Sequence, residues 1–436
     1  MTRSTHDPAV RVEPRQQARP EPSAHVRALL TVWLSWLALM TGANLAAPLY
    51  AVYAAHFGFS ELELTAIFAC YAFVLIPALL LFGRLSDRFG RRPVLFAGLA
   101  VACAGLVLFI VADSTGWLFA ARAAQGLAVG MISGPATAAL VELDPSARER
   151  QSKRPALLAG LAQAGGSALG PLIAGILAQW APQPLRLSYL ILLGATAITA
   201  IFTLKLPEPT TENREPWRIQ RPRVPAEIRA DFARVSLSAA TMWGSVALYL
   251  SVVPSYAETL LHSHNLALLG AIAALALGAS CGALVVAQRV HTSPRRSRGG
   301  PQGPQGSQAG GLRRSQAGGL GVLALGLAAL VIVAPLHSLP LLLAGAIATG
   351  AGHGLGFLNA QDELNAIAPD SRRGEVTAAF VCCIYLMVGG AVIVTGLLSL
   401  TFSLPVAVAV IAVVLAATAV VAATWQARHI RTARFR

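Results

Sequence analysis

Charged side chains are scarce in this chain. Asp, Glu, Lys and Arg make up 12% of its 436 residues, whereas hydrophobic residues make up 55%, and mean hydropathy is +0.60. Soluble domains carry about 25% charged residues. A composition so poor in charge excludes an ordinary soluble domain and predicts a protein with several membrane spans.

Cysteine is also rare, and its placement excludes further classes of protein. The five cysteines all fall inside apolar runs, at Cys70, Cys103, Cys281, Cys382 and Cys383. Their spacing fits neither a metal site nor a secreted disulfide framework, so we expect small packing residues. The chain has no Walker loop, no Rossmann glycine pattern and no His/Cys cluster, which argues against ATP-driven or redox chemistry. We therefore expect neither enzyme activity nor a bound metal or cofactor.

Apolar runs of about 20 residues, the length of a helix that crosses a bilayer, recur along the chain. Lipid offers no hydrogen-bond partners to an open backbone, so each run is predicted to be helical. Twelve spans are predicted, at residues 29–53, 64–83, 93–112, 117–141, 155–180, 187–206, 236–257, 266–287, 319–336, 339–360, 376–400 and 404–425.

The basic residues orient these spans. With the N-terminus placed in the cytoplasm, 32 of the 34 Lys and Arg residues fall in cytoplasmic loops and tails, leaving Arg186 outside and Arg122 within a span. This bias predicts a multi-pass protein of the plasma (inner) membrane with both termini cytoplasmic. The net charge of +14 is interpreted as topology and attraction to anionic lipids, with no role in nucleic-acid binding.

Polar segments divide the chain into two sets of six spans. The predicted parts are a cytoplasmic tail (1–28), a first half (29–206), a proline-rich basic linker (207–235), a second half (236–425) and a cytoplasmic tail (426–436). The first apolar run is longer than that of a secretory signal, so we expect it to remain as an uncleaved helix.

One segment of the second half has low complexity. Residues 291–319 are rich in Gly, Pro, Gln and Arg, and the hexapeptide Ser-Gln-Ala-Gly-Gly-Leu occurs at both 307–312 and 315–320. Such a composition cannot bury a core, so it predicts a disordered cytoplasmic insert.

The polar loop after the second span carries the most specific motif. From Gly83 to Arg92 it reads GRLSDRFGRR. The order of its glycines, acid and basic pair resembles the loop between the second and third helices of the major facilitator superfamily. The resemblance implies an all-α membrane protein with twelve transmembrane helices in two pseudo-symmetric six-helix halves. It also implies a monomeric transporter that works by alternating access.

A mechanical role is predicted for this loop. Its glycines permit close approach and unusual backbone angles, and by the resemblance Asp87 latches the outward-facing state against the second half, near Glu375. The predicted conformational latch comprises Gly83, Asp87, Arg88, Gly90, Arg91 and Arg92. The arginines have the alternative role of topology anchors. The matching segment of the second half, residues 282–289, contains no acid, so we expect the two halves not to be latched symmetrically.

Arg122 is the only charge predicted to lie well inside a span. It lies about six residues, or roughly 9 Å, below the start of its helix, where an unpaired charge costs a few kcal/mol. Together with Gln125 it resembles the superfamily's fourth-helix motif, whose arginine is linked to proton transfer in proton-coupled members. Because arginine does not deprotonate, it would bias a nearby acid or water chain, or attract an anionic substrate. The alternative is a later helix start that leaves Arg122 at the interface.

The fifth span suggests a transport direction. Its residues 166–175 resemble the signature g-x-x-x-G-P-x-x-G-G of drug:proton antiporters, with Ala174 in place of one glycine. The matching residues are Gly166, Gly170, Pro171 and Gly175. Glycines four apart let a partner helix approach closely, and proline removes a backbone hydrogen bond. The alternative interpretation is ordinary packing of small residues.

The substrate cavity of this fold lies near the membrane midplane, between helices one, four, seven and ten. Its predicted lining is Asn44, Tyr50, Gln125, Trp243, Tyr249 and His353, although for the tyrosines and the tryptophan packing is the alternative. His353 is predicted to be the only buried histidine, and imidazole can titrate near neutral pH; a packed, hydrogen-bonded histidine is the alternative. No acid is predicted deep in a span, so Glu258, His353 or another edge acid would have to couple protons.

These observations together favour a secondary active transporter. The expected activity is proton-coupled efflux of a small apolar or amphipathic compound, with the substrate, protons and membrane lipids as partners. The alternatives are an importer or uniporter of a small polar or anionic metabolite, and a receptor or scaffold that has lost transport.

Overall fold

Helices occupy all twelve predicted spans in the computed structural model, which describes residues 22–83, 85–144, 154–208, 221–292 and 304–432. Over these ranges the chain contains helices and loops and no strand. The spans are α1 (Pro22–Asn44) continued by η1 (Ala47–Leu49) and α2 (Tyr50–Phe57), α3 (Glu61–Phe82), α5 (Arg91–Ile110), α6 (Thr115–Leu143), α7 (Arg154–Trp180), α8 (Leu187–Thr203), α9 (Arg229–Ser251) with α10 (Val253–Leu261), α11 (Leu266–Thr292), α12 (Pro304–Leu336), α13 (Leu339–Ile367), α14 (Arg373–Leu398) and α15 (Leu404–Thr432). The short elements between them are α4 (Leu85–Phe89), η3 (Ala226–Ile228) and η5 (Asp370–Arg372).

The helices differ in how well each one alone could cross a bilayer. Among the described residues, ten are long and apolar enough, and the pair α9 and α10, bent by 49° at its break, forms an eleventh candidate. The predicted sixth span is α8, whose 17 residues are at the lower limit for crossing. The predicted class, an all-α membrane protein, is confirmed.

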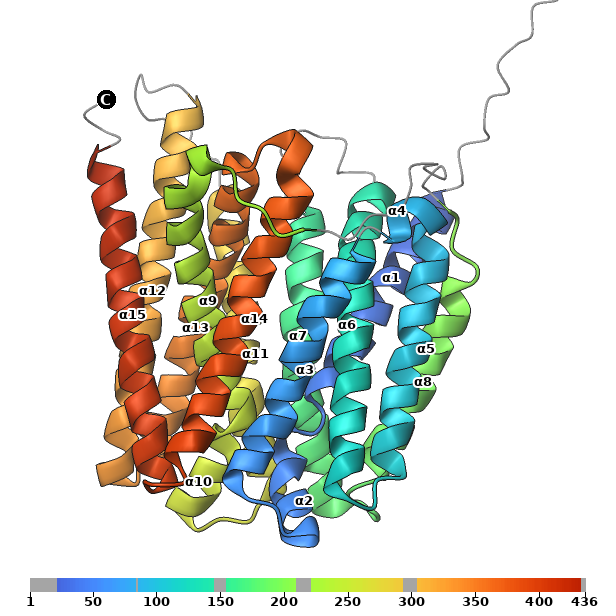
Figure 1. Cartoon of the computed structure of the whole chain (residues 1–436), viewed down its shortest axis with the longest axis vertical. Coiled ribbons are helices and arrows are strands. Elements are labelled where there is room, and N and C mark those ends of the chain that lie inside the picture. Colours follow the sequence, from blue (N-terminus) through green and yellow to red (C-terminus); the bar gives the residue numbers. More distant parts are fainter. Residues whose placement is uncertain (1–21, 84, 145–153, 209–220, 293–303, 433–436) are drawn as a thin grey trace, which may run out of the picture.

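The chain folds into two groups of helices that lie side by side (Figure 1). Helices α1 to α8 form the first half and α9 to α15 the second. The closest packing between them joins α3 to α14 and α7 to α11. Figure 1 shows α4 and the end of α15 at one end of the bundle, and α2 and α10 at the other. We call these the α4 end and the α10 end; the charge distribution predicts that the α4 end is cytoplasmic.

Several contacts join the two halves between the middle of the bundle and the α10 end. On α3, Thr65 packs against Gly396 of α14, and Phe73 lies beside Gly389, where an added methyl group would come within 3.2 Å of its ring. Near the α10 end of α7, the Gln179 side chain accepts a hydrogen bond from the backbone of Leu266 on α11 (2.8 Å). The halves are therefore held together on the α10 side.

Apolar side chains cover the outside of the bundle as well as its core. On α8, exposed apolar side chains include Leu190, Ile191, Ile198, Ile201 and Phe202. A soluble domain rarely exposes apolar patches of this extent, whereas lipid tails make such a surface stable. The outward face of α8 therefore fits a position at the lipid boundary.

The low-complexity segment is helical over part of its length, which corrects the prediction of a disordered insert. Helix α12 begins at Pro304, and the second copy of the repeat lies inside it. The Gln316 side chain is fully buried, and a methyl group on Gly319 would lie 3.0 Å from the backbone of Gly356 on α13. Glycine that signals disorder in water here permits close helix packing. Residues 293–303 lie outside the described residues.

The packing of α7 against α1 predicts a steric effect at Gly170. A methyl group there would lie 3.0 Å from the backbone of Asn44 and Leu45, where neither helix can yield locally. Gly170→Ala should lower the free energy of unfolding by about 1–3 kcal/mol, the usual cost of overpacking. Gly194→Ala is the matched control, because no atom lies within 4 Å of its added methyl group. Thermal unfolding in detergent would measure both, and equal stabilities would contradict this packing.

Candidate functional site

Arg122 is buried at the centre of the first half. Its Nη1 donates to the backbone carbonyl of Ala43 (2.5 Å) and to Oε1 of Gln125 (2.9 Å), and its Nη2 donates to the carbonyl of Phe68 (3.3 Å). The guanidinium carbon also lies 5.1 Å from the ring centroid of Phe68 and 4.6 Å from that of Tyr71. Only 1% of the residue is exposed, so the alternative of an interfacial position for Arg122 is wrong.

The break in the first span explains these bonds. Helix α1 ends at Asn44, and the carbonyl groups of a last helical turn lack their usual donors. Arg122 bonds the carbonyl of Ala43, and Nε2 of Gln125 bonds that of Gly42 (2.8 Å). In lipid each such group must be satisfied within the protein. Arg122 and Gln125 therefore hold the broken first span in place.

This geometry narrows the predicted roles of the Arg122 cluster. Among the described residues no acid contacts the guanidinium, so an acid biased by direct contact is absent from this conformation. Gln125 borders a small cavity between α1, α5, α6 and α8, which lies inside the first half. Tyr50 is also buried in the packed core, and Asn44 donates to Ser167 on α7 (3.0 Å). The predicted cavity residues of the first half thus mainly join its own helices.

His353 forms an aromatic cluster in the second half. Its ring meets Trp243 of α9 edge-on at 4.8 Å and stacks on Phe357 of α13 at 5.4 Å, measured between centroids. Trp243 and Phe357 contact each other at 5.5 Å. Nδ1 of His353 shares a hydrogen bond with the hydroxyl of Ser280 on α11 (2.8 Å), whereas Nε2 has no partner among the described residues. We call His353, Trp243 and Phe357 the aromatic cluster.

Glycines on either side of His353 position the ring. Methyl groups on Gly350 and Gly354 would each lie 3.0 Å or less from the backbone of α11, so α13 approaches α11 closely enough for His353 to reach Ser280. As predicted, His353 is the only histidine that is buried among the described residues. Trp243 is partly exposed, but Tyr249 is fully buried. Packing is therefore the role that the structure supports for Tyr249.

The predicted latch residues form a charge cluster at the α4 end. Nη1 of Arg91 donates to Asp87 (2.5 Å), and Nη2 donates to Glu142 at the end of α6 (3.0 Å). Asp87 contacts no described residue of the second half, so its predicted reach towards Glu375 remains a prediction for another conformation. Arg88 and Arg92 are exposed, which fits the role of topology anchors. We call Asp87, Arg91 and Glu142 the first-half clamp.

A residue that the sequence did not single out completes this loop. Glu208, just after α8, accepts hydrogen bonds from the backbone N–H groups of Arg91 (2.7 Å) and Arg92 (3.1 Å) at the start of α5. Negative charge is favourable at a helix N-terminus. Gly90 has φ 94°, and a side chain there would collide with the Glu208 carboxylate. Gly90 therefore shows both the close approach and the unusual backbone angle that are predicted for the glycines of this motif.

The fifth span places its glycines at two helix contacts. Gly166 and Gly170 face α1, whereas Gly175 faces α11 across the boundary between the halves, 3.1 Å from Gly270 when a methyl group is added. Pro171 lies inside α7 without ending it. The motif residues therefore join α7 to one helix of each half. Close packing is shown for them; the antiporter role stays a prediction.

Glu258 lies at the α10 end of the second half. Its carboxylate is bonded to Nδ1 of His264 (2.8 Å) in the loop after α10. The pair is far from the aromatic cluster along the sequence and is borne by a different helix. Nothing in the contacts of Glu258 joins it to His353, so the two predicted proton-coupling residues do not form one site.

The sequence of the chain matches a family profile over most of the first half and beyond. Residues 32–299 match the Major Facilitator Superfamily. The chain belongs to the major facilitator superfamily. Secondary transport, rather than an enzymatic reaction, is the activity of this family.

Individual relatives of this superfamily chain match over short stretches. The inner membrane transport protein YajR of Escherichia coli is 37% identical over 97 residues, which is 21% of this chain and 20% of YajR. A triacylglyceride transporter of Mycolicibacterium smegmatis is 37% identical over 118 residues, or 27% of this chain and 20% of that protein. A triacylglyceride transporter of Mycobacteroides abscessus is 37% identical over 118 residues, which is 27% of this chain and 22% of that protein. The chain thus matches about a fifth of the length of these curated relatives.

Solved structures of transporters share the superfamily fold. The nucleoside transporter NupG superposes with a TM-score of 0.66 at 11% identity, covering 92% of this chain and 99% of NupG. A bacterial homologue of the human lysosomal transporter Spinster, in an inward-facing and occupied conformation, superposes with a TM-score of 0.63 at 17% identity. The superposition covers 94% of this chain and 97% of that structure. At these identities the likeness concerns the fold alone.

Two buried charges of this superfamily member were not predicted from the sequence. Arg234 falls within the predicted basic linker (207–235), but it lies in α9 and is 1% exposed. Glu363 lies beyond the predicted end of the tenth span at residue 360, but it is buried in α13. The signal that reveals them is their pairing in space, because each alone resembles an ordinary charge at the end of a span.

The bonds of Arg122 predict that its shape matters as much as its charge. Arg122→Lys keeps the positive charge but loses the planar fork that reaches three acceptors. It should lower the free energy of unfolding by about 1–3 kcal/mol, because buried carbonyl groups lose their donors. Arg186→Lys is the control, since Arg186 is exposed in the loop before α8. Thermal unfolding of the purified protein would check this, and an unchanged Arg122→Lys variant would show that charge alone suffices.

Proposed function

We propose that this transporter exports a small apolar or amphipathic compound in exchange for protons. The observation that carries the proposal is the aromatic cluster. Trp243 and Phe357 are partly exposed, and they lie on α9 and α13, which correspond to two of the helices that line the cavity in this fold. An apolar compound would gain both buried area and ring contacts there.

The chemistry around the cluster favours an apolar ligand over a charged one. Among the described residues, Ser280 is the only side chain that forms a hydrogen bond with a ring of the cluster. Aromatic pairs contribute about 0.5–1.5 kcal/mol beyond the area that they bury, whereas a charged substrate would lose its water without gaining a partner. A polar group on an amphipathic compound would find the Nε2 atom of His353.

The partial relatives agree with an apolar substrate. Two of them are named triacylglyceride transporters, and a triacylglyceride is almost wholly apolar. Their match covers only 27% of this chain, so the argument extends to the chemical class of the substrate and no further.

Export is supported by the fifth span and by the arrangement of the halves. The residues Gly166, Gly170, Pro171 and Gly175 follow the antiporter signature, and the packing of α7 uses each of its glycines. Contacts that include Thr65 with Gly396 and Gln179 with Leu266 join the halves near the α10 end, which supports a conformation closed on the side predicted to be external. A compound would then be taken up from the cytoplasmic side before release outside.

The alternative is an importer or uniporter of a small polar or anionic metabolite, and it gains support if Arg122 binds an anion. In this structure Arg122 already donates to three acceptors and is buried. An anion would have to displace bonds that hold the first span. This argues against the alternative.

Transport in vesicles would test the proposal. The purified protein is reconstituted with a pH-sensitive dye inside the vesicles, a proton gradient is imposed, and apolar, amphipathic, polar and anionic compounds are added in turn. We expect apolar or amphipathic compounds to trigger proton movement. Uptake that is equal with and without the gradient would contradict proton coupling, and a response to anions alone would contradict the substrate class.

The aromatic cluster predicts an affinity change at Trp243. Trp243→Ala removes ring contacts with the compound, so the concentration at half-maximal proton movement should rise about tenfold, equivalent to roughly 1.4 kcal/mol. Trp180→Ala is the matched control, because Trp180 is 71% exposed at the end of α7. If both variants respond alike, the cluster does not bind the substrate.

A further inference from the structure

Arg234 lies in a buried network of charges at the α4 end of the second half. Its Nη2 atom donates to Glu363 of α13 (2.7 Å) and to Asp231, one turn earlier on α9 (2.8 Å). Its Nη1 atom donates to the second oxygen of Glu363 (3.3 Å) and to the side chain of Gln426 on α15. One guanidinium thus bonds side chains from three helices.

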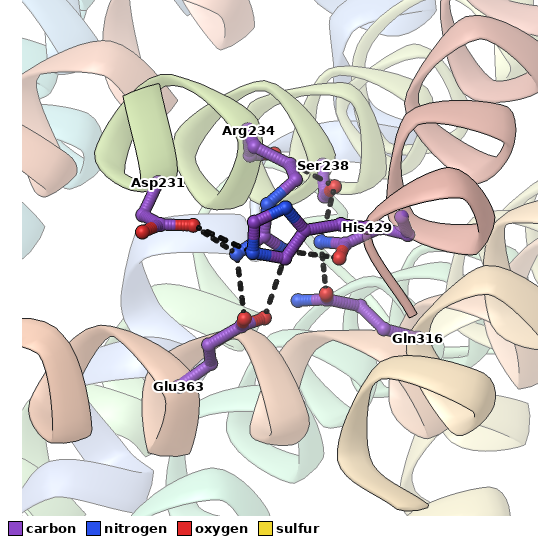
Figure 2. A network of polar contacts seen from close by, with 7 residues as sticks. Asp231, Arg234, Ser238, Gln316, Glu363 and His429 are labelled. Atoms are coloured by element: carbon purple, nitrogen blue, oxygen red, sulfur yellow. Dashed lines mark hydrogen bonds and ion pairs between the residues drawn. The ribbon is translucent and has the colours of Figure 1, made fainter. Parts of the chain in front are cut away.

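The network extends to a fourth helix, as Figure 2 shows. The side-chain amide of Gln426 contacts that of Gln316 of α12, and it also lies 3.5 Å from the hydroxyl of Ser238. At its exposed edge, Asp231 is paired with His429 of α15 (3.3 Å). In Figure 2 the side chains of Arg234, Ser238, Gln316 and Glu363 point towards one another.

The two halves have the same pattern of ion pairs at the α4 end, but different helices supply the arginine. In each half an arginine near the start of one span pairs with an acid three or four residues earlier, Asp87 or Asp231. The same arginine pairs with a glutamate near the end of the fourth span of its half, Glu142 or Glu363. The first half takes its arginine from the third span, and the second half takes Arg234 from its first span.

The exposure of the two arrangements differs sharply. Side-chain exposure is 12% for Arg91, 50% for Asp87 and 32% for Glu142 in the first half. In the second half it is 1% for Arg234 and 6% for Glu363, and only Asp231, at 35%, is comparably exposed. Exposed ion pairs are weak and are screened by salt. A buried pair cannot lose one partner without leaving a charge unpaired in apolar surroundings, which is strongly unfavourable.

We propose that Arg234, Glu363, Gln316 and Gln426 form a permanent second-half clamp, which replaces the loop motif missing at residues 282–289. It keeps α9, α12, α13 and α15 together as one body throughout the transport cycle. The first-half clamp is the releasable one: its bonds open and re-form as the α4 end opens and closes. This inference concerns the motion of the fold, and it holds whichever compound is carried.

Hydrogen exchange on the full-length protein in lipid nanodiscs tests the clamp without any substrate. In Glu363→Gln, the neutral amide leaves Arg234 without its buried counter-charge. Exchange should accelerate about tenfold or more in all four helices, at residues 229–240, 315–323, 358–367 and 420–429, because a cooperative unit opens together. The matched control is Glu142→Gln, which should accelerate exchange only around α4 and the start of α5.

Salt separates the permanent clamp from the releasable one in the unaltered protein. Raising salt from about 0.05 to 0.5 M shortens the screening distance to a few ångströms. Exchange should accelerate in residues 85–95 and stay constant in the four helices of the second half. Equal salt dependence at both clamps would overturn the proposal, and so would acceleration in Glu363→Gln that is confined to α13.

Two milder variants keep the test decisive if Glu363→Gln does not fold. Arg234→Lys retains the charge but loses the planar fork that bonds both oxygens of Glu363, so exchange in α13 should accelerate, but by less than in Arg234→Met, which also removes the charge. Gln426→Leu removes the bonds of α15 to Arg234 on α9 and to Gln316 on α12 while keeping the pair of Arg234 with Glu363, so exchange should accelerate in α15 and α12 and stay constant in α13. Unchanged exchange in Gln426→Leu, or equal loss in Arg234→Lys and Arg234→Met, would contradict the clamp.

Discussion

The constraint on which this structure depends is that a polar group inside the bundle must find its partner within the protein. Lipid supplies no hydrogen bonds, so the break in the first span after Asn44 would leave carbonyl groups unsatisfied. Arg122 and Gln125 reach across from α6 to bond them. A charge that is costly inside a membrane thus stabilises the break in the first span.

The same constraint explains the two clamps at the α4 end. Arg91 and Arg234 each hold an acid on a neighbouring turn and a glutamate at the end of a fourth span. The loop motif is absent from the second half, and yet the physical task is performed there by Arg234. The two halves therefore differ in which helices supply the charged residues and in how exposed those residues are. Both halves nevertheless have a cluster of ion pairs at the α4 end.

Small residues bring the helices close enough for these bonds to form. Gly350 and Gly354 let α13 approach α11, which places His353 against Ser280, and Gly319 lets α12 approach α13. The second of these contacts lies in a repeat that predicts disorder when it is judged as a soluble segment. Glycine lowers helix stability in water, but between membrane helices it permits backbone contact. The same glycine-rich sequence therefore favours disorder in water and close helix packing in a membrane.

The sequence by itself determined the class of this protein, its twelve spans, the position of the loop motif and the burial of Arg122 and His353. These follow from apolar run length, charge distribution and local motifs, which act within one segment of chain. Only the tertiary structure decided what those residues touch: that Arg122 serves a helix break, that His353 joins Trp243 and Phe357, and that Arg234 meets Glu363 from 129 positions away. Pairing across such distances depends on how helices pack, and no single segment of the sequence contains that information.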